Sequence, residues 1–253
     1  MHKFLIPLCI TVFMVSCFSN KTTSDAVVNF EKIEVKKKVG DLSIDSTYEV
    51  SVVYHNPVNV PVYLKDSILK YTKLLFASWF DVKGQFDLNG SVKKHFDEHF
   101  RQIAENNLPG RTIFMLEISP EDVYQNKDII SFAYNWMIYE GGVHPNSGKF
   151  CFVLDKSTGS KVNYKNLIKG HEAEFLSLAE AEFKKQAGIK ADERIYEPYW
   201  FKDGKLHLTD NYMFTSKGIV FCYDPYEIAP YSFGLIELTL PYDKIKDMVK
   251  FHK

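Results

Sequence analysis

Two kinds of hydrophobic period occur in this chain, and they do not alternate regularly. Strand-like runs, in which alternate or successive residues are apolar, lie at residues 27–39, 48–55, 112–119, 129–139, 149–155, 206–214, 218–223 and 235–240. Helical spacing of three and four lies at residues 64–80, 91–106 and 172–187. Groups of strands therefore follow groups of helices. This order predicts an α+β fold with antiparallel sheets that carry helices on one face, and it allows two similar sub-domains.

Three short signals predict where elements begin, end or turn. Ser91 is placed to cap the helix that follows it, and Gly188 is placed to end the helix at 172–187. The sequence Lys202-Asp203-Gly204-Lys205 is typical of a two-residue hairpin turn. We therefore expect a hairpin between residue 201 and the strand at 206–214.

The first residues predict export. Residues 1–16 combine Lys3 with an apolar stretch from Phe4 to Val15, which is too short to span a membrane. The run Met14-Val15-Ser16-Cys17 resembles the lipoprotein box, so we expect Cys17 to carry lipid, although ordinary secretion with an unmodified Cys17 stays open. The expected organisation is a signal peptide at 1–16, a tether at 17–26, an α+β region at 27–140 and a second domain at 141–253.

Composition excludes some classes of function. With 45% hydrophobic residues the chain of 253 residues can bury a core, and it is not disordered. The 31 basic residues are balanced by 32 acidic ones, so no overall field attracts nucleic acid. We expect no nucleic-acid partner, and contact with a membrane only through the lipid anchor.

The titratable and thiol side chains give few catalytic signals. His95 and His99 have the i, i+4 spacing of metal ligands, but no third ligand is indicated, so we expect no metal and no cofactor. Cys151 and Cys222 lie in apolar strand-like runs, where they either form a disulfide or remain buried thiols. We expect neither of them to be a catalytic nucleophile.

Two loops stand out as candidate binding segments. The first, residues 139–146, places a glycine pair and His144-Pro145 at the end of the longest strand. The second, residues 224–234, is rich in tyrosine and proline, which offer contact area at low entropy cost. The structural alternatives are that His144 satisfies a strand end and that the second loop covers a sheet edge.

Three segments in the second half of the chain carry a family resemblance. They are GGVHPN at 141–146, FVLDKSTGSKVNYKNLI at 152–168 and GIVFCYDPYEIAPYSFG at 218–234. Together they resemble the extracellular module of the RsiV anti-sigma family, which is also found before the catalytic domain of PdaC-type peptidoglycan deacetylases. The resemblance covers residues 129–241. The matching positions are Gly141, Gly142, His144, Pro145, Thr158, Gly159, Tyr226, Glu227, Ile228, Ala229, Pro230, Tyr231 and Gly234.

The resemblance implies an envelope binding module. Anti-sigma members bind lysozyme and signal through a membrane helix, and the deacetylases act through a further catalytic domain; we expect neither of these parts here. The expected function is a lipid-anchored, non-catalytic envelope protein that binds a secreted muramidase such as lysozyme, or peptidoglycan. The candidate binding residues are Glu140, Gly141, Gly142, His144, Pro145, Tyr226, Glu227, Pro230 and Tyr231.

Two alternatives to that function stay open. The first is a glycan-acting enzyme that uses His144 and a nearby carboxylate as acid and base. The second is a structural envelope lipoprotein without a small ligand.

Overall fold

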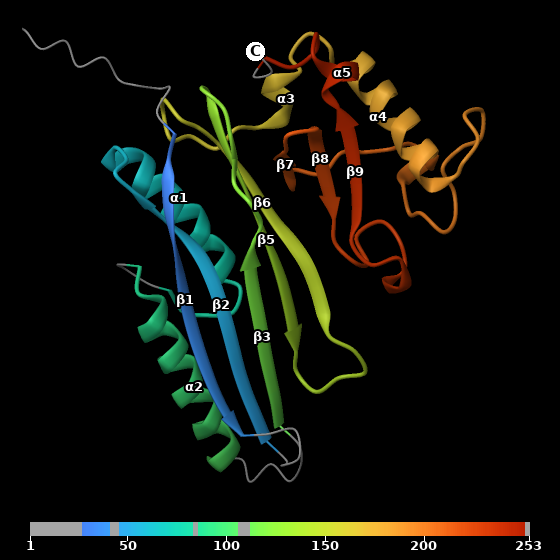
Figure 1. Cartoon of the computed structure of the whole chain (residues 1–253). Coiled ribbons are helices and arrows are strands. Elements are labelled where there is room, and N and C mark those ends of the chain that lie inside the picture. The colour runs from blue at the N-terminus through green and yellow to red at the C-terminus, as the bar shows by residue number, and fades with distance from the viewer. Residues whose placement is uncertain (1–26, 41–45, 83–85, 106–111, 251–253) are drawn as a thin grey trace, which may run out of the picture.

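The fold is α+β, as predicted, with helices packed against two sheets (Figure 1). The structure is a computed structural model that describes residues 27–40, 46–82, 86–105 and 112–250. The expected signal peptide, Cys17 and the tether lie outside the described residues. No helix in the described part of the chain is both long enough and apolar enough to cross a membrane.

The larger sheet is mixed. Its strands are β1 (Asn29–Gly40), β2 (Ser46–Val58), β3 (Thr112–Pro120), the short β4 (Tyr124–Gln125), β5 (Ile129–Tyr139) and β6 (Asn146–Asp155). All pairs are antiparallel except β2 and β3, which are parallel with Val50 opposite Leu116. A parallel pair needs a long crossover, and the segment with both N-terminal helices supplies it. The expected antiparallel arrangement therefore holds for every pair but this one.

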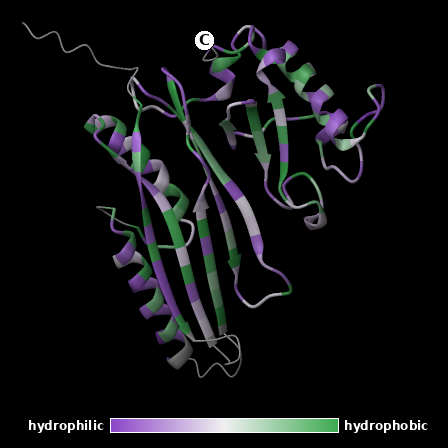
Figure 2. Cartoon of the chain, in the orientation of Figure 1, coloured by the Kyte–Doolittle hydropathy of each residue, from purple (hydrophilic) through white to green (hydrophobic). Residues whose placement is uncertain are grey.

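One face of the larger sheet forms the first core. Tyr48, Val50 and Val52 alternate inward along β2, as the period-two pattern predicted, and all three are buried. The helices α1 (Val62–Phe76) and α2 (Leu88–Glu105) cover this face. Hydrophilic and hydrophobic residues alternate along α2 in Figure 2, as expected for a helix with one buried side.

The start of α2 differs from the sequence prediction. Ser91 does not cap the helix, because α2 already begins at Leu88. Asp87 lies in the capping place instead, where its Oδ1 accepts a hydrogen bond from Gly90 N at 2.9 Å. A carboxylate can satisfy the free amides of a first turn as well as a serine can.

The second sheet is antiparallel and consists of β7 (Tyr212–Phe214), β8 (Gly218–Tyr223) and β9 (Ile236–Pro241). Helix α4 (Glu172–Ala187) packs against β9, and the shorter helical elements are α3 (Tyr164–Leu167), η1 (Lys202–Gly204), η2 (Tyr231–Phe233) and α5 (Tyr242–Ile245). As predicted, Gly188 ends α4 in the left-handed conformation, with φ 70°.

The predicted hairpin at residues 202–205 is wrong. Asp203 and Gly204 do have positive φ values of 57° and 63°, as such a turn requires, but they form a 3₁₀ turn without paired strands. Phe201 and Leu206, on either side, are buried in the core of the second sheet. Side-chain burial therefore decides the path of the chain here, and the strand expected from residue 206 is reduced to the three residues of β7.

Side chains join the two sheets along the edge of β6. Asn211 Oδ1 accepts from Cys151 N at 2.8 Å, while its Nδ2 donates to Lys149 O at 2.7 Å and to Cys222 O at 3.2 Å. Asp224 Oδ1 accepts from Lys149 N at 2.8 Å. These two side chains supply the partners that another strand would otherwise give to the edge of β6.

Candidate functional site

The first candidate loop turns back on the end of β5. The Tyr139 hydroxyl donates to Gly142 O at 2.9 Å, which holds the turn across its base. Gly141 has φ 81°, a conformation that a glycine adopts without strain. Glu140, Gly141 and Gly142 lie at the surface, and Val143 projects fully into solvent. The loop is therefore fixed at its base and open at its tip.

The second candidate loop is anchored at both ends. Glu227 Oε2 accepts from Asp224 N at 2.9 Å and closes the first turn. Ile228 and Ala229 are buried, and Ile228 holds the middle of the loop against the core of the second sheet. Tyr226 is 55% exposed and has φ 69°, so its ring is directed outward from a tight turn. The loop thus shows aromatic surface on a firmly held backbone.

The two loops, which are far apart in sequence, meet in space. The rings of His144 and Tyr231 are stacked, with centroids 3.8 Å apart and an interplanar angle of 22°. The Tyr231 hydroxyl donates to Pro145 O at 2.5 Å, and the ring of Tyr226 lies 5.5 Å from that of Tyr231. Residues 140–145 and 224–234, called the paired loops below, therefore form one surface.

His144 has no catalytic geometry among the described residues. Its Nδ1 lies 2.9 Å from Pro145 O, and its ring contacts Tyr231. No described carboxylate lies within hydrogen-bond distance of the imidazole, so the acid and base pair of the enzymatic alternative is not assembled here. In this structure the side chain joins the paired loops.

Lys149, on β6, is a buried charged residue beside the paired loops. Its ammonium contacts Glu121 Oε1 at 2.5 Å and Glu237 Oε1 at 2.6 Å, and its side chain is only 6% exposed. Burial alone lowers the pKa of Lys149, but the hydrogen bonds to the two carboxylates outweigh it and raise the pKa. Lys149 is therefore a permanently charged structural residue.

Asp224 is the part-buried acid of the site. Burial raises its pKa, and the hydrogen bond from Lys149 N opposes that effect. A Cβ added at Gly148 would lie 2.5 Å from Asp224 Oδ1 and 2.6 Å from Trp136 Cζ2. Gly148 is thus a glycine because a carboxylate and an indole both pack onto its backbone.

The structure brings Cys151 and Cys222 together. Their Sγ atoms are 3.8 Å apart, on β6 and β8, and both residues are buried. The contact with Cys222, together with burial, raises the pKa of Cys151, which disfavours a reactive thiolate. Sequence spacing alone did not reveal this proximity. A disulfide between these residues stays a prediction.

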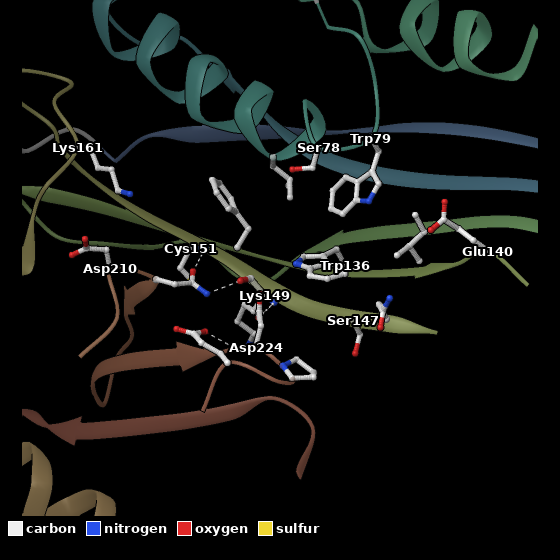
Figure 3. Close-up of a pocket in the computed structure, with 17 residues that line it drawn as sticks. Ser78, Trp79, Trp136, Glu140, Ser147, Lys149, Cys151, Lys161, Asp210 and Asp224 are labelled. Atoms are coloured by element: carbon white, nitrogen blue, oxygen red, sulfur yellow. Dashed lines mark hydrogen bonds between the residues drawn. The ribbon is translucent and has the colours of Figure 1, made fainter. Parts of the chain in front are cut away.

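A cleft of about 900 Å³ opens beside the paired loops (Figure 3). Trp79, just beyond α1, and Trp136, on β5, lie on one side of it with ring centroids 5.5 Å apart. The lining carboxylates are Glu140, Asp210, Asp224 and Glu227. The sequence does not indicate this cleft. Trp79 lies within the helical period at 64–80 and Trp136 within the strand-like run at 129–139, and neither pattern predicts that the two rings meet.

The histidine pair on α2 does not line the cleft. His95 Nδ1 is 3.0 Å from the Tyr48 hydroxyl, and the rings of His95 and His99 pack around Tyr48 and Phe114. Within the described ranges, no group of three His, Cys, Asp or Glu residues could hold a metal ion. The pair belongs to the packing between α2 and the larger sheet.

Comparison with known proteins shows which fold the chain shares. Residues 165–243 match the profile of DUF3298, a family described as a protein of unknown function. A crystal structure of a DUF3298 family member from Bacteroides fragilis is 19% identical, with a TM-score of 0.69 over 89% of this chain and 95% of that one. A DUF3298 family protein from Pseudomonas aeruginosa is 17% identical, with a TM-score of 0.59 over 90% and 97%. No curated protein matches the sequence.

Proposed function

We propose that this chain is a lipid-anchored, non-catalytic binding protein of the bacterial cell envelope, whose paired loops recognise a secreted muramidase of the lysozyme type. The observation that carries the proposal is the assembly of the paired loops into one acidic, aromatic surface. The RsiV resemblance supports the proposal, because its segments at 141–146 and 218–234 contain most of the paired loops. The DUF3298 match at 165–243 overlaps most of the resembling range of 129–241.

The stiffness of the paired loops favours binding. The His144–Tyr231 stack and the hydrogen bond to Pro145 O hold the two loops before a partner arrives. Tyr226 and Phe233, which are 55% and 43% exposed, then offer rings that lose little conformational entropy on contact. Exposed aromatic side chains on a fixed backbone are typical anchors of protein interfaces.

The charge of the paired loops favours a basic partner. Residues 140–145 and 224–234 contain Glu140, Asp224 and Glu227 but no lysine or arginine, although the whole chain is nearly neutral. Glu140 and Glu227 are exposed. Such a local acidic surface attracts basic proteins and speeds their association without any overall charge on the molecule.

The proposed anchor can be tested directly. If Cys17 carries lipid, the exported protein fractionates with membranes, and Cys17→Ser releases it into the soluble fraction. Retention of the Cys17→Ser protein on membranes would contradict the anchor without affecting the proposal for the paired loops.

The binding test uses the mature chain with Cys17→Ser and lysozyme as the probe. We expect Glu140→Gln combined with Glu227→Gln to slow association about tenfold at low salt, with a smaller difference at high salt. The substitution Glu227→Gln keeps a side-chain oxygen that can still accept the hydrogen bond from Asp224 N. Surface plasmon resonance at several salt concentrations gives both rates.

The matched control replaces two exposed glutamates elsewhere, Glu31→Gln with Glu174→Gln, which lie on β1 and α4. This control has the same change in net charge and should associate almost as fast as the parent. Equal slowing in both double variants would mean that only net charge matters. Unchanged binding in the Glu140/Glu227 variant would contradict the proposed surface.

A further inference from the structure

We infer that the cleft beside the paired loops is a separate binding site for a neutral oligosaccharide. This inference does not rest on the proposed muramidase partner, because Trp79 and Trp136, which form its aromatic platform, lie outside the paired loops. Three residues of the paired loops, Glu140, Asp224 and Glu227, also line the cleft. The volume of about 900 Å³ is large enough for several sugar rings. Figure 3 shows the two indoles side by side between α1 and the strand β6.

The two tryptophans give the cleft an aromatic platform made of two rings that are tilted relative to each other. Their ring centroids are 5.5 Å apart at an interplanar angle of 53°, and both side chains are partly exposed. Neither indole N–H donates a hydrogen bond to another residue that the structure describes. Each ring therefore offers an apolar face together with a free donor, the combination that suits the C–H face and the hydroxyl groups of a sugar.

Polar side chains with unused hydrogen-bonding capacity surround the platform. Ser78, Asn146 and Ser147 line the cleft, and none of these side chains is hydrogen-bonded to another described residue. Glu140 and Asp210 add carboxylate oxygens as acceptors near opposite ends of the lining (Figure 3). A ligand rich in hydroxyl groups can use donors and acceptors of this kind at the same time.

The charges of the lining exclude acidic ligands. Four carboxylates line the cleft, whereas one of its two lysines, Lys149, already pairs with Glu121 and Glu237. The remaining lysine, Lys161, does not balance the acids. Phosphate esters, nucleotides and sugars with acid groups would be repelled.

The size and polarity of the cleft exclude two other ligand classes. A lipid chain requires an apolar enclosure, but this cleft is open and half polar. A small organic cation bound by aromatic rings requires a close cage, whereas the cleft is many times larger than one ammonium group. A neutral oligosaccharide fits the length, the polarity and the aromatic platform together.

The test uses the mature chain with Cys17→Ser and Trp200→Phe, and a tetramer of β-1,4-linked N-acetylglucosamine as the probe. Trp200 is half exposed, lies outside the cleft, and is the only tryptophan besides Trp79 and Trp136. Without it, the fluorescence of the protein reports only the two tryptophans of the cleft. We expect a saturable change on titration with the tetramer, which Trp79→Phe weakens about five- to tenfold.

A second variant and a control separate the cleft from the paired loops. Asn146→Ala removes an exposed cleft side chain without touching the core, so it should weaken saccharide binding even if Trp79→Phe disturbs folding. Tyr226→Ala should leave saccharide affinity unchanged, because Tyr226 does not line the cleft, while weakening lysozyme binding.

Three results would overturn the inference. The first is no saturable change up to about 10 mM tetramer. The second is binding that neither Trp79→Phe nor Asn146→Ala weakens. The third is binding of the deacetylated, cationic tetramer alone, which would make the cleft an amine site. If the parent protein, with its paired loops unchanged, binds the saccharide but not lysozyme, only the proposed function is contradicted.

Discussion

The imidazole of His144 lies stacked on the ring of Tyr231, with centroids 3.8 Å apart, and this contact joins two loops that lie far apart in the sequence. The hydroxyl of the same tyrosine reaches Pro145 O. One aromatic residue on the second loop therefore fixes both the side chain and the backbone of the first.

This stack predicts a measurable coupling between the two side chains. A double-mutant cycle with His144→Ala and Tyr231→Ala should give a coupling free energy of about 1 kcal/mol in denaturant unfolding. Because the contact between His144 and Tyr231 holds the two loops together, each single change should also raise the rate of hydrogen exchange at residues 141–143. Strictly additive effects would show that the rings touch without stabilising each other.

The hydrogen bonds of Asn211 between the two sheets predict a large loss of stability when this residue is replaced. Asn211→Ala leaves Cys151 N, Lys149 O and Cys222 O without this partner, which should lower the free energy of unfolding by about 2–3 kcal/mol. Urea unfolding followed by circular dichroism measures the change. Asn166→Ala, at an exposed position of α3, serves as the control and should have almost no effect.

Buried His55 predicts a loss of stability in acid. Burial, followed by the nearby Lys32, lowers the pKa of His55 from 6.5 to about 4. As the pH falls below 6.5, the unfolded chain takes up a proton at this histidine that the folded chain does not accept. The contribution of His55 to stability, up to about 3 kcal/mol, is therefore present above pH 6.5 and is lost as the pH falls towards 4.

His55→Leu measures that contribution. The ring packs against Phe30 and Phe132, so an apolar side chain can occupy the site. The variant should lose less stability than the parent between pH 6.5 and 4. A residual dependence of stability on pH should remain, because burial also lowers the pKa of His95. Parallel pH profiles of parent and variant would show that His55 does not titrate as inferred.

The adjacent thiols predict a disulfide in the exported protein. Oxidised glutathione can accept the two electrons and two protons of Cys151 and Cys222, which then form one S–S bond between β6 and β8. The bond would close a loop of about 70 residues and add about 4 kcal/mol to the free energy of unfolding. Non-reducing mass spectrometry should find the chain lighter by two hydrogen atoms.

The matched control for the disulfide is Cys222→Ser. It should lack the mass change and should show the same stability with and without reductant. If both cysteines of the exported parent react with an alkylating agent after unfolding without reductant, the pair is a pair of buried thiols instead.

The secondary structure with strong local signals could be predicted from sequence. The bounds of β5, α4 and β8 agree with the expected ranges, because long apolar runs and Gly188 specify them locally. The turn at Asp203 was predicted wrongly, since its local signal for a hairpin was overruled by burial of the residues beside it.

The candidate site could be predicted only in part. Each of the paired loops was identified from its own residues, and the structure adds that they meet through His144 and Tyr231. The Trp79–Trp136 cleft was not found, because its residues come from segments with no shared local pattern. Contacts between distant segments depend on how the sheets pack, which no single run of sequence records.

The contacts that attach the second sheet to the larger one also show what an engineered replacement for that sheet would need. The second sheet is held to β6 by an amide at Asn211 and a carboxylate at Asp224, and to the neighbouring strand β5 by the hydrogen bond from Phe214 N to the Ser131 hydroxyl. A designer who grafts a different three-stranded module onto this scaffold must reproduce three polar positions and an apolar face, and need not extend the backbone ladder.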